Sequence, residues 1–226
     1  RRAMVPQSLV EDVLGCFRKD DSQSITRSTI DKFVDAKPDE IRKAIRWCDR
    51  RDWLNIEEDS LSLTDEGKRE AKRLLRAHRL WETYLEHLGT PSEQLHDRAH
   101  ILEHLHDKET VEYLDDKLGH PLRDPHGAEI PVDTVQLAPG KTVKLALLRN
   151  GQSGTIDRVE GKLTGPRLVV GGHITMGPRK EDGNVWTTRL ADGRWIELDH
   201  SAADSVHVTL DSDTTTFAPS SSTSSD

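Results

Sequence analysis

The chain has 226 residues, of which 34% are hydrophobic, and a formal net charge of −8. It has no run of eighteen apolar residues and no charged segment leading into an apolar core, so the sequence predicts neither a membrane span nor an export signal. We expect a cytoplasmic protein of two or three small domains, and Cys16 and Cys48, which form no C-x-x-C pair, predict neither a disulfide framework nor a thiolate zinc site.

The first third of the chain predicts three helices followed by a hairpin. Apolar residues recur at helical spacing over residues 9–17, a second short helix is expected over 26–34, and Pro38 opens a third. Two short β-like runs over 54–63 surround an acidic tip. This order of elements is that of a winged helix-turn-helix, which we assign to residues 1–66.

The next segment predicts a helical domain over residues 67–134. A long amphipathic helix is expected over 66–88, where a Gly-Thr-Pro sequence ends it. Shorter helices are expected over 92–106 and 108–118. A stretch rich in proline and glycine then predicts an extended linker.

Beyond the linker the composition changes to β-branched runs separated by glycine, which predicts a small barrel over residues 135–210. The expected strands cover 142–148, 154–159, 167–170, 185–190, 194–198 and 206–210. We expect Trp186 and Trp195 to pack in the core of this domain rather than to form an aromatic binding platform. The Ser/Thr-rich residues 211–226 predict a disordered tail. The fold class is therefore mainly α with a β-rich C-terminal part.

Histidines and carboxylates on two neighbouring predicted helices carry the candidate chemistry. At about 100° per residue, four side chains of the helix over 92–106 share an arc of about 100°. These four are His96, His100, Glu103 and His104. His78 and Glu82 form an i, i+4 pair on the preceding helix. A lone histidine is more often a solvated helix residue, but six such donors each carry a solvation cost that a bound metal ion offsets. Because no nucleophile or phosphate loop accompanies them, we expect a metal-binding protein rather than a metallohydrolase or another enzyme.

Four segments, in chain order, carry a resemblance to a known family. They are LTDEG at 63–67, RAHRLWE at 76–82, HDRAHILEH at 96–104 and DPHGAEIP at 124–131. In this order and spacing they resemble signatures of the diphtheria toxin repressor and manganese transport regulator family, the iron-dependent repressors. The resemblance covers residues 9–131 and implies a winged helix, a helical metal-binding and dimerisation domain and a small SH3-like C-terminal domain.

The resemblance also implies roles for individual residues. The primary metal site is expected to consist of Asp12, His100, Glu103 and His104, with His100 standing where relatives have cysteine or glutamate. The ancillary site is expected to consist of His78, Glu82 and His96. These donors are all nitrogen or oxygen, which suits Mn(II) or Fe(II) and leaves Zn(II) and Co(II) as further candidates. Because Asp12 lies in the winged helix and the other primary ligands lie in the helical domain, we expect a bound metal ion to couple the two.

The third predicted helix leaves the output of metal sensing open. Its basic residues, which can meet phosphates, are Lys37, Arg42, Lys43 and Arg46. Its first turn also carries Asp39 and Glu40, and the hairpin tip is acidic, which repels phosphate. The sequence is therefore compatible with a free-standing repressor that binds operator DNA and with a regulator that has lost DNA binding.

The tryptophan-bearing segment 79–85 is similar to the repressor-like domain that is fused behind metal-transporting ABC permeases. The chain starts with Arg1 and Arg2 and has no initiator methionine, and in such a fusion both arginines would lie just inside the membrane. This interpretation predicts the cytoplasmic part of a larger protein at the inner membrane, with permease domains as partners. Under both interpretations we expect a homodimer, formed through apolar surface of the helical domain.

Overall fold

The computed structural model describes residues 5–18, 24–105, 107–133, 136–161, 168–180 and 183–212. Contacts between residues divide the chain into two units, Arg1–Pro131 and Val132–Asp226. Within the described residues, no helix is both long enough and apolar enough to cross a membrane. The tail predicted from the sequence lies outside these ranges from residue 213 onward.

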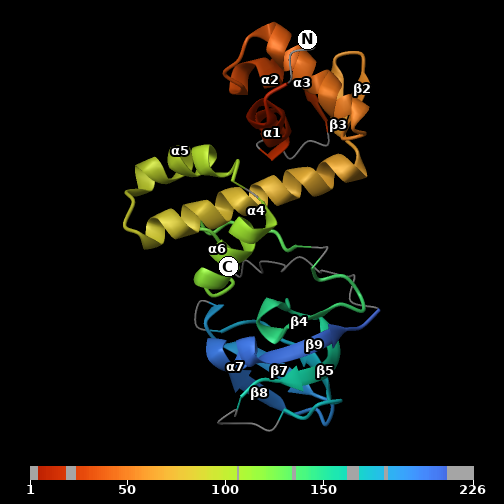
Figure 1. Ribbon diagram of the computed structural model, residues 1–226, viewed down its shortest axis with the longest axis vertical. Helices are drawn as coiled ribbons and strands as arrows, with labels where there is room; N and C mark the ends of the chain where they lie inside the picture. Colours follow the sequence, from red (N-terminus) through yellow and green to blue (C-terminus); the bar gives the residue numbers. More distant parts are fainter. Residues whose placement is uncertain are drawn as a thin grey trace, which may run out of the picture. The chain divides into compact units, whose positions relative to one another are not determined.

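The first unit begins with a winged helix-turn-helix (Figure 1). Its elements are α1 (Gln7–Gly15), β1 (Ser24–Thr26), α2 (Arg27–Phe33), α3 (Pro38–Arg50), β2 (Leu54–Glu57) and β3 (Ser60–Leu63). The three strands form an antiparallel sheet in the order β1-β3-β2. The order of helices and hairpin that the sequence predicts is therefore confirmed.

Apolar side chains from the helices and the hairpin form one buried core in this winged helix. Val10, Ile30 and Ala44 are fully covered, and Cys16 and Cys48 are buried in the same core. Burial raises the pKa of the Cys48 thiol to about 12. Both cysteines therefore serve as small apolar residues.

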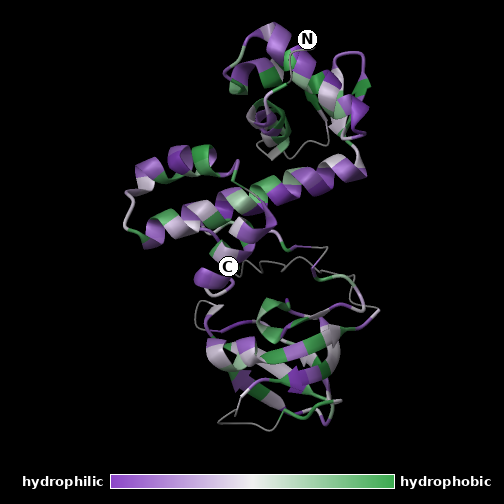
Figure 2. Cartoon of the chain, in the orientation of Figure 1, coloured by the Kyte–Doolittle hydropathy of each residue, from purple (hydrophilic) through white to green (hydrophobic). Residues whose placement is uncertain are grey.

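Three further helices follow in the first unit: α4 (Asp65–His87), α5 (Ser92–Leu102) and α6 (Lys108–Lys117). Helix α5 lies alongside α4, and α6 also contacts α4 (Figure 1). Hydrophilic and hydrophobic residues alternate along α4 (Figure 2). Its apolar residues Leu74, Leu80 and Leu85 are buried, so α4 is the helix on which the others pack.

The start of α4 is fixed against the hairpin. Thr64 Oγ1 accepts a hydrogen bond from the backbone N–H of Gly67 at 3.0 Å and so caps the helix. The Trp53 carbonyl group approaches so closely that a Cβ added to Gly67 would lie 1.9 Å from its oxygen. Only glycine allows this approach of α4 to the end of the preceding turn.

Two arginines of α4 hold the end of the first unit. Arg76 forms a buried ion pair with Asp115 of α6 at 3.0 Å and donates to the Pro131 carbonyl oxygen at 2.7 Å. Arg79 lies 3.3 Å from the Asp124 carboxylate. The proline-rich stretch that the sequence predicts as an extended linker is therefore packed onto α4 as far as residue 131.

The second unit is a six-stranded antiparallel sheet in the order β4-β9-β5-β6-β7-β8, with one short helix, α7 (His200–Ser205). The strands are β4 (Thr142–Lys144), β5 (Ser153–Val159), β6 (His173–Met176), β7 (Trp186–Leu190), β8 (Trp195–Leu198) and β9 (Val206–Leu210). Trp186 is buried as predicted, and its indole N–H donates to the Ala146 carbonyl oxygen at 2.9 Å. The fold class that the sequence predicts, mainly α with a small β domain at the C-terminal end, is confirmed.

Two details of the second unit differ from the sequence prediction. Trp195 is 57% exposed rather than part of the core, because β8 turns Ile196 inward and its neighbours outward. No strand forms over the described part of 167–170. The strand forms a few residues later, at β6, where Ile174 and Met176 alternate into the core.

Replacing Gly67 with alanine is expected to destabilise the first unit. The new Cβ would overlap the Trp53 carbonyl, a backbone group that moves only with the hairpin, so we expect a loss of about 1–3 kcal/mol in the free energy of unfolding. Urea unfolding followed by circular dichroism measures the loss. The control is Lys68→Ala, at the neighbouring exposed position, which should change the value by less than about 0.5 kcal/mol. Equal midpoints for both variants would contradict the close approach.

Candidate metal centre

The structure brings the seven candidate metal ligands together in two adjoining clusters of the first unit. The first cluster consists of Asp12, His100, Glu103 and His104. The second cluster consists of His78, Glu82 and His96. The ligand atoms of Asp12, His100 and Glu103 lie within 4.8 Å of one another, and so do those of the second cluster. Neither cluster is built by one helix alone.

The first cluster joins the winged helix to the helical part of the unit. Asp12 belongs to α1, His100 belongs to α5, and Glu103 and His104 follow α5 directly. The Nε2 atoms of His100 and His104 lie 3.6 Å and 3.7 Å from Asp12 Oδ1. His100 Nδ1 lies 3.1 Å from Oε1 of Glu103, which is completely buried.

Asp12 Oδ1 is the atom that tests whether these residues fit a metal ion. This oxygen is buried and has no hydrogen-bond partner among the described residues, and burial raises the pKa of the Asp12 carboxyl group against the influence of His100 and His104. The two imidazole nitrogens that face it are too distant for hydrogen bonds. Donors bound to one ion at about 2.1 Å are about 3–4 Å apart, which is the spacing found here. The first cluster therefore fits a divalent metal ion.

The second cluster has the same spacing. His78 Nε2 lies 3.1 Å from Glu82 Oε1 and 3.2 Å from His96 Nδ1, and His96 Nδ1 lies 3.3 Å from Glu82 Oε1. The three atoms form an almost equilateral triangle. His78 and Glu82 are buried one turn apart on α4, whereas the His96 side chain is 58% exposed. This triangle fits one face of the coordination shell of a second ion.

A direct hydrogen bond connects the two clusters. His78 Nδ1 contacts Oε2 of Glu103, whose other oxygen faces His100. His78 therefore belongs to the second cluster through Nε2 and contacts the first through Nδ1. A change at either cluster acts on the other through this pair.

Carboxylates change the proton affinity of the cluster histidines. Burial disfavours the protonated form of His78, but its hydrogen bonds to the Glu103 and Glu82 carboxylates outweigh burial and raise the His78 pKa. Burial likewise opposes ionisation of Glu82, but His78 outweighs it and lowers the Glu82 pKa. The hydrogen bond to Glu11 raises the pKa of His104. Metal ions and protons therefore compete for these imidazoles.

Two residues at the clusters are absent from the sequence-based set. Glu11 is 3% exposed, and its Oε2 lies 2.5 Å from His104 Nδ1. His126 Nε2 lies 3.8 Å from Glu82 Oε1, at the edge of the second cluster. Glu11 could have been found as the neighbour of Asp12 in the same helix, and His126 lies in the DPHGAEIP segment, whose histidine had no assigned role.

The prediction that four ligands share one face of a helix over 92–106 is wrong in its geometry. Helix α5 ends at Leu102, and the Leu105 N–H donates to the Leu102 carbonyl oxygen at 2.8 Å in a tighter turn. Glu103 is the C-cap and still donates its N–H to the Ala99 carbonyl oxygen at 2.7 Å, whereas His104 lies in the turn beyond it. The two histidines that are on α5 belong to different clusters.

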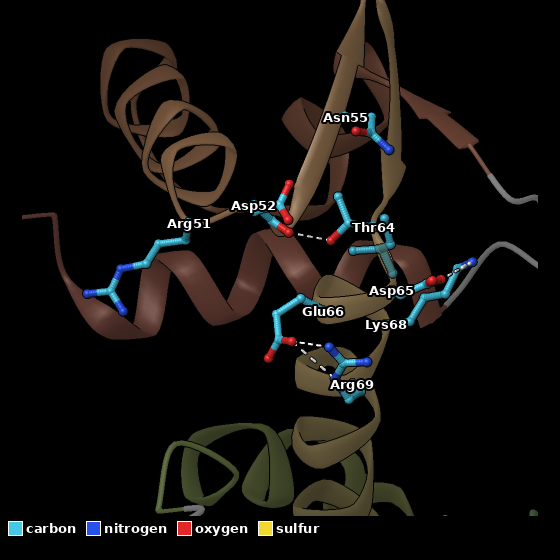
Figure 3. A pocket seen from close by; sticks show the side chains of 9 residues that line it. Arg51, Asp52, Asn55, Thr64, Asp65, Glu66, Lys68 and Arg69 are labelled. Carbon is cyan, nitrogen blue, oxygen red and sulfur yellow. Dashed lines mark hydrogen bonds and ion pairs between the residues drawn. The ribbon is translucent and has the colours of Figure 1, made fainter.

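A polar pocket of about 580 Å³ lies where the hairpin meets α4 and is lined by none of the cluster residues (Figure 3). Its charged side chains pair with one another, Glu66 with Arg69 and Asp65 with Lys68. Figure 3 shows these pairs along the first turns of α4. Because acids and bases neutralise each other here, the pocket offers no converging set of ligands.

The candidate DNA-contacting residues are all exposed on or just before α3. They are Lys37, Arg42, Lys43 and Arg46. Arg42 forms an ion pair with Asp39 of the same helix. Glu40 accepts a hydrogen bond from the backbone N–H of Lys37 at 3.1 Å and caps the helix start. Acidic and basic groups are thus mixed on this surface.

A winged helix joined to helices whose carboxylates and imidazoles converge defines the class of metal-dependent regulators. Residues 64–132 match the family described as "Iron dependent repressor, metal binding and dimerisation domain". The resemblance carried by the sequence motifs is confirmed over this part of the chain.

The curated relatives that match are membrane proteins. The chain is 37% identical over 94 residues to a probable metal transport system membrane protein of Chlamydia trachomatis. The aligned segment covers 41% of this chain and 19% of the relative. The chain is 42% identical over 82 residues to a protein of the same description from Chlamydia pneumoniae, covering 36% and 18%. The chain spans about a fifth of the length of these relatives.

Solved structures with a similar fold are regulators. A manganese-dependent transcriptional repressor in complex with manganese is 24% identical, with 89% of this chain and 99% of the other covered at a TM-score of 0.51. ScaR with bound zinc is 25% identical, with 90% and 99% covered at a TM-score of 0.50. These likenesses extend over both units and confirm the fold.

The raised pKa values of His78 and His104 predict how the stability of the metal-free protein depends on pH. A folded-state pKa above the unfolded value contributes stability that is fully present below about pH 6.5 and is lost as the pH rises through the raised pKa. We therefore expect the free energy of unfolding, measured with urea in the presence of a chelator, to fall as the pH rises above about 6.5.

A matched pair of variants separates this contribution from that of other groups. His104→Gln should flatten part of the pH profile, whereas His87→Gln, at an exposed position on the last turn of α4, should leave it unchanged. A wild-type profile that is level over this range would contradict the assigned contacts.

Proposed function

We propose that the chain is a metal-sensing regulatory module whose two clusters bind divalent transition-metal ions. Asp12, His100, Glu103 and His104 would hold one ion, and His78, Glu82 and His96 would hold the other. The observation that carries the proposal is the buried Asp12 Oδ1, which faces two imidazole nitrogens and, in the part of the chain that the structure describes, has no hydrogen-bond partner. A bound ion supplies the positive charge that this oxygen lacks.

The donor set favours Mn(II) or Fe(II). All the ligands are carboxylates or imidazoles, which suit these ions, and neither buried cysteine belongs to a cluster. Zn(II) and Co(II) accept the same donors, and a solved structure with a similar fold is ScaR with bound zinc. Selection among these ions then depends on coordination geometry and on cellular supply.

The regulatory step that we propose is coupling between α1 and the helical part of the unit. Asp12 is the one candidate ligand that the winged helix contributes, and the other three residues of the first cluster belong to α5 or to the turn after it. Occupancy would favour the arrangement in which α1 is held against this turn. Because coupling free energies are reciprocal, a partner that binds this arrangement would also tighten metal binding.

For the output, we propose that the chain regulates a metal transporter to which it is attached. The matching curated relatives are described as probable metal transport system membrane proteins, and the chain spans about a fifth of their length. The charges on α3 support this assignment, because Asp39 and Glu40 occupy the first turn and Asp39 neutralises Arg42. A surface of this kind is poorly suited to phosphate groups. The module would then act on the cytoplasmic face of the membrane and adjust transport to the metal supply.

We further propose that the module is a homodimer. Large apolar side chains at the ends of α4 and α5 are exposed, namely Leu88, Ile101 and Leu105. Ile101 is 71% exposed, which is costly for an apolar side chain in water unless a partner covers it. The matching family model describes a dimerisation domain over this part of the chain.

A second candidate function is a free-standing repressor that binds operator DNA when metal is bound. The observation that favours it is the exposed basic row on α3, formed by Lys43, Arg46 and Arg50. The described solved relative with manganese is a transcriptional repressor of nearly the same length as the chain. Arg42 is paired with Asp39, whereas Lys43 and Arg46 are exposed farther along α3. Lys43 and Arg46 would therefore carry the phosphate contacts.

Metal binding is tested by removing one imidazole from each cluster. Isothermal titration of the wild-type protein with Mn(II) should give two ions per chain, His104→Ala should lose the first and His96→Ala should lose the second. The control, His87→Ala, removes an exposed histidine outside both clusters and should keep two. If all three variants bind as the wild type does, the proposed sites are wrong.

The two outputs are separated by an electrophoretic shift with promoter DNA of metal-uptake genes, with and without Mn(II). The regulator of an attached transporter should give no manganese-dependent shift, because acidic groups interrupt the basic surface of α3. A known manganese-dependent repressor with its own operator serves as the positive control. A tight manganese-dependent shift that Arg46→Glu abolishes would establish the repressor instead.

A further inference from the structure

We propose that Glu11 is a positioning residue that holds the His104 imidazole with its Nε2 toward Asp12. The proposal rests on the metal site proposed above and adds to it a residue that is not itself a ligand. Glu11 and Asp12 are consecutive in α1, yet each faces a different nitrogen of the same ring.

The contacts of Glu11 determine where the proton of His104 lies. Glu11 Oε2 is 2.5 Å from His104 Nδ1, and Glu11 Oε1 accepts a hydrogen bond from Gln7 Nε2 at 2.9 Å. A carboxylate only accepts hydrogen bonds, so Nδ1 must donate and carry the proton. In the neutral ring Nε2 then keeps its lone pair, and Nε2 is the atom that faces Asp12 Oδ1 at 3.7 Å.

His104 needs such support because of its place in the fold. It lies in the turn after α5 rather than on the helix, so regular helical backbone does not restrict its rotamer. Glu11, in contrast, is 3% exposed and belongs to a well-packed helix, in which Val10 and Val13 are also buried. The rigid partner is therefore the carboxylate, and the ring takes its orientation from it.

Glu11 would act as a carboxylate does when it accepts a hydrogen bond from the non-ligating nitrogen of a metal-binding histidine. Such partners fix the tautomer and the ring plane, and their removal weakens metal binding about 10–100-fold. They also keep a buried carboxylate hydrogen-bonded, which a packing role alone would not require. The hydrogen bond further ties α1 to residue 104 independently of any ion at the cluster.

Two variants of Glu11 separate positioning from packing. Glu11→Leu keeps a side chain of similar volume but removes the acceptor, and Glu11→Gln keeps one acceptor oxygen and the shape. Positioning predicts that the Mn(II) affinity at the first cluster, measured by isothermal titration, falls about 10–100-fold in E11L and less in E11Q. A packing role predicts wild-type affinity for E11L, because leucine fills the same buried space, and that result would overturn the proposal.

The second readout is independent of metal binding. Long-range ¹H–¹⁵N spectra of the metal-free protein distinguish the Nδ1–H from the Nε2–H tautomer of His104. We expect the Nδ1–H form in the wild type and a mixed population in E11L, whereas Glu86→Leu, at an exposed position on α4, should leave it unchanged. An unchanged tautomer in E11L would also overturn the proposal.

The outcomes for this proposal and for the metal site can be told apart. If His104→Ala leaves Mn(II) binding intact, the metal site is wrong, and the tautomer spectra of E11L still report on the role of Glu11. If His104→Ala abolishes binding at the first cluster while E11L binds as the wild type does, the metal site stands and the positioning role is wrong. Should E11L fail to fold, the isosteric E11Q carries both measurements.

Discussion

The central interaction of the first unit is the close approach of one carboxylate of the winged helix to two imidazoles at the end of α5. Asp12 Oδ1 is removed from water and no described residue forms a hydrogen bond with it, while His100 and His104 face it at distances too long for hydrogen bonds. A buried anionic oxygen in this position is unfavourable unless a cation joins it to the imidazoles. The same atoms lie on both sides of the junction between the winged helix and the helical part, so the chemistry that satisfies Asp12 also joins these parts.

The two clusters are adjoining rather than separate, and this follows from the position of Glu103. Its carboxylate is completely buried at the end of α5, with one oxygen toward His100 and the other toward His78 of α4. An end of a helix can direct a side chain between two neighbouring elements, which a position on the regular face cannot do as easily. Occupancy of one cluster is therefore expected to change the charge and orientation that the other cluster experiences.

The exposed surface of α3 in the winged helix carries both acidic and basic groups. Helix α3 has basic residues along its exposed side but acids in the turn that would approach a DNA backbone, and Arg42 is engaged by Asp39. The fold itself is shared with transcriptional repressors, whereas the curated relatives are metal transport membrane proteins. Fold alone does not decide between these outputs, because function resides in the surface chemistry that the fold carries.

Local patterns in the sequence determined the helices, the hairpin and the donor types of the metal centre. Apolar periodicity and the i, i+4 pair of His78 and Glu82 are properties of short segments, and each is found where the sequence places it. The strand expected over 167–170 failed, because exposed valines resemble a strand locally and only packing assigns that role to His173–Met176.

Tertiary structure alone decided which donors share an ion and which residues support them. Helix α5 ends at Leu102 with Glu103 as its C-cap, and His104 lies in the turn beyond the helix on which the sequence placed it. Glu11 reaches His104 across 93 positions of the chain, a contact that no local period encodes. Periodicity reports which face of an element a residue occupies, but the meeting of two faces depends on how whole elements pack, and that is a property of the folded chain.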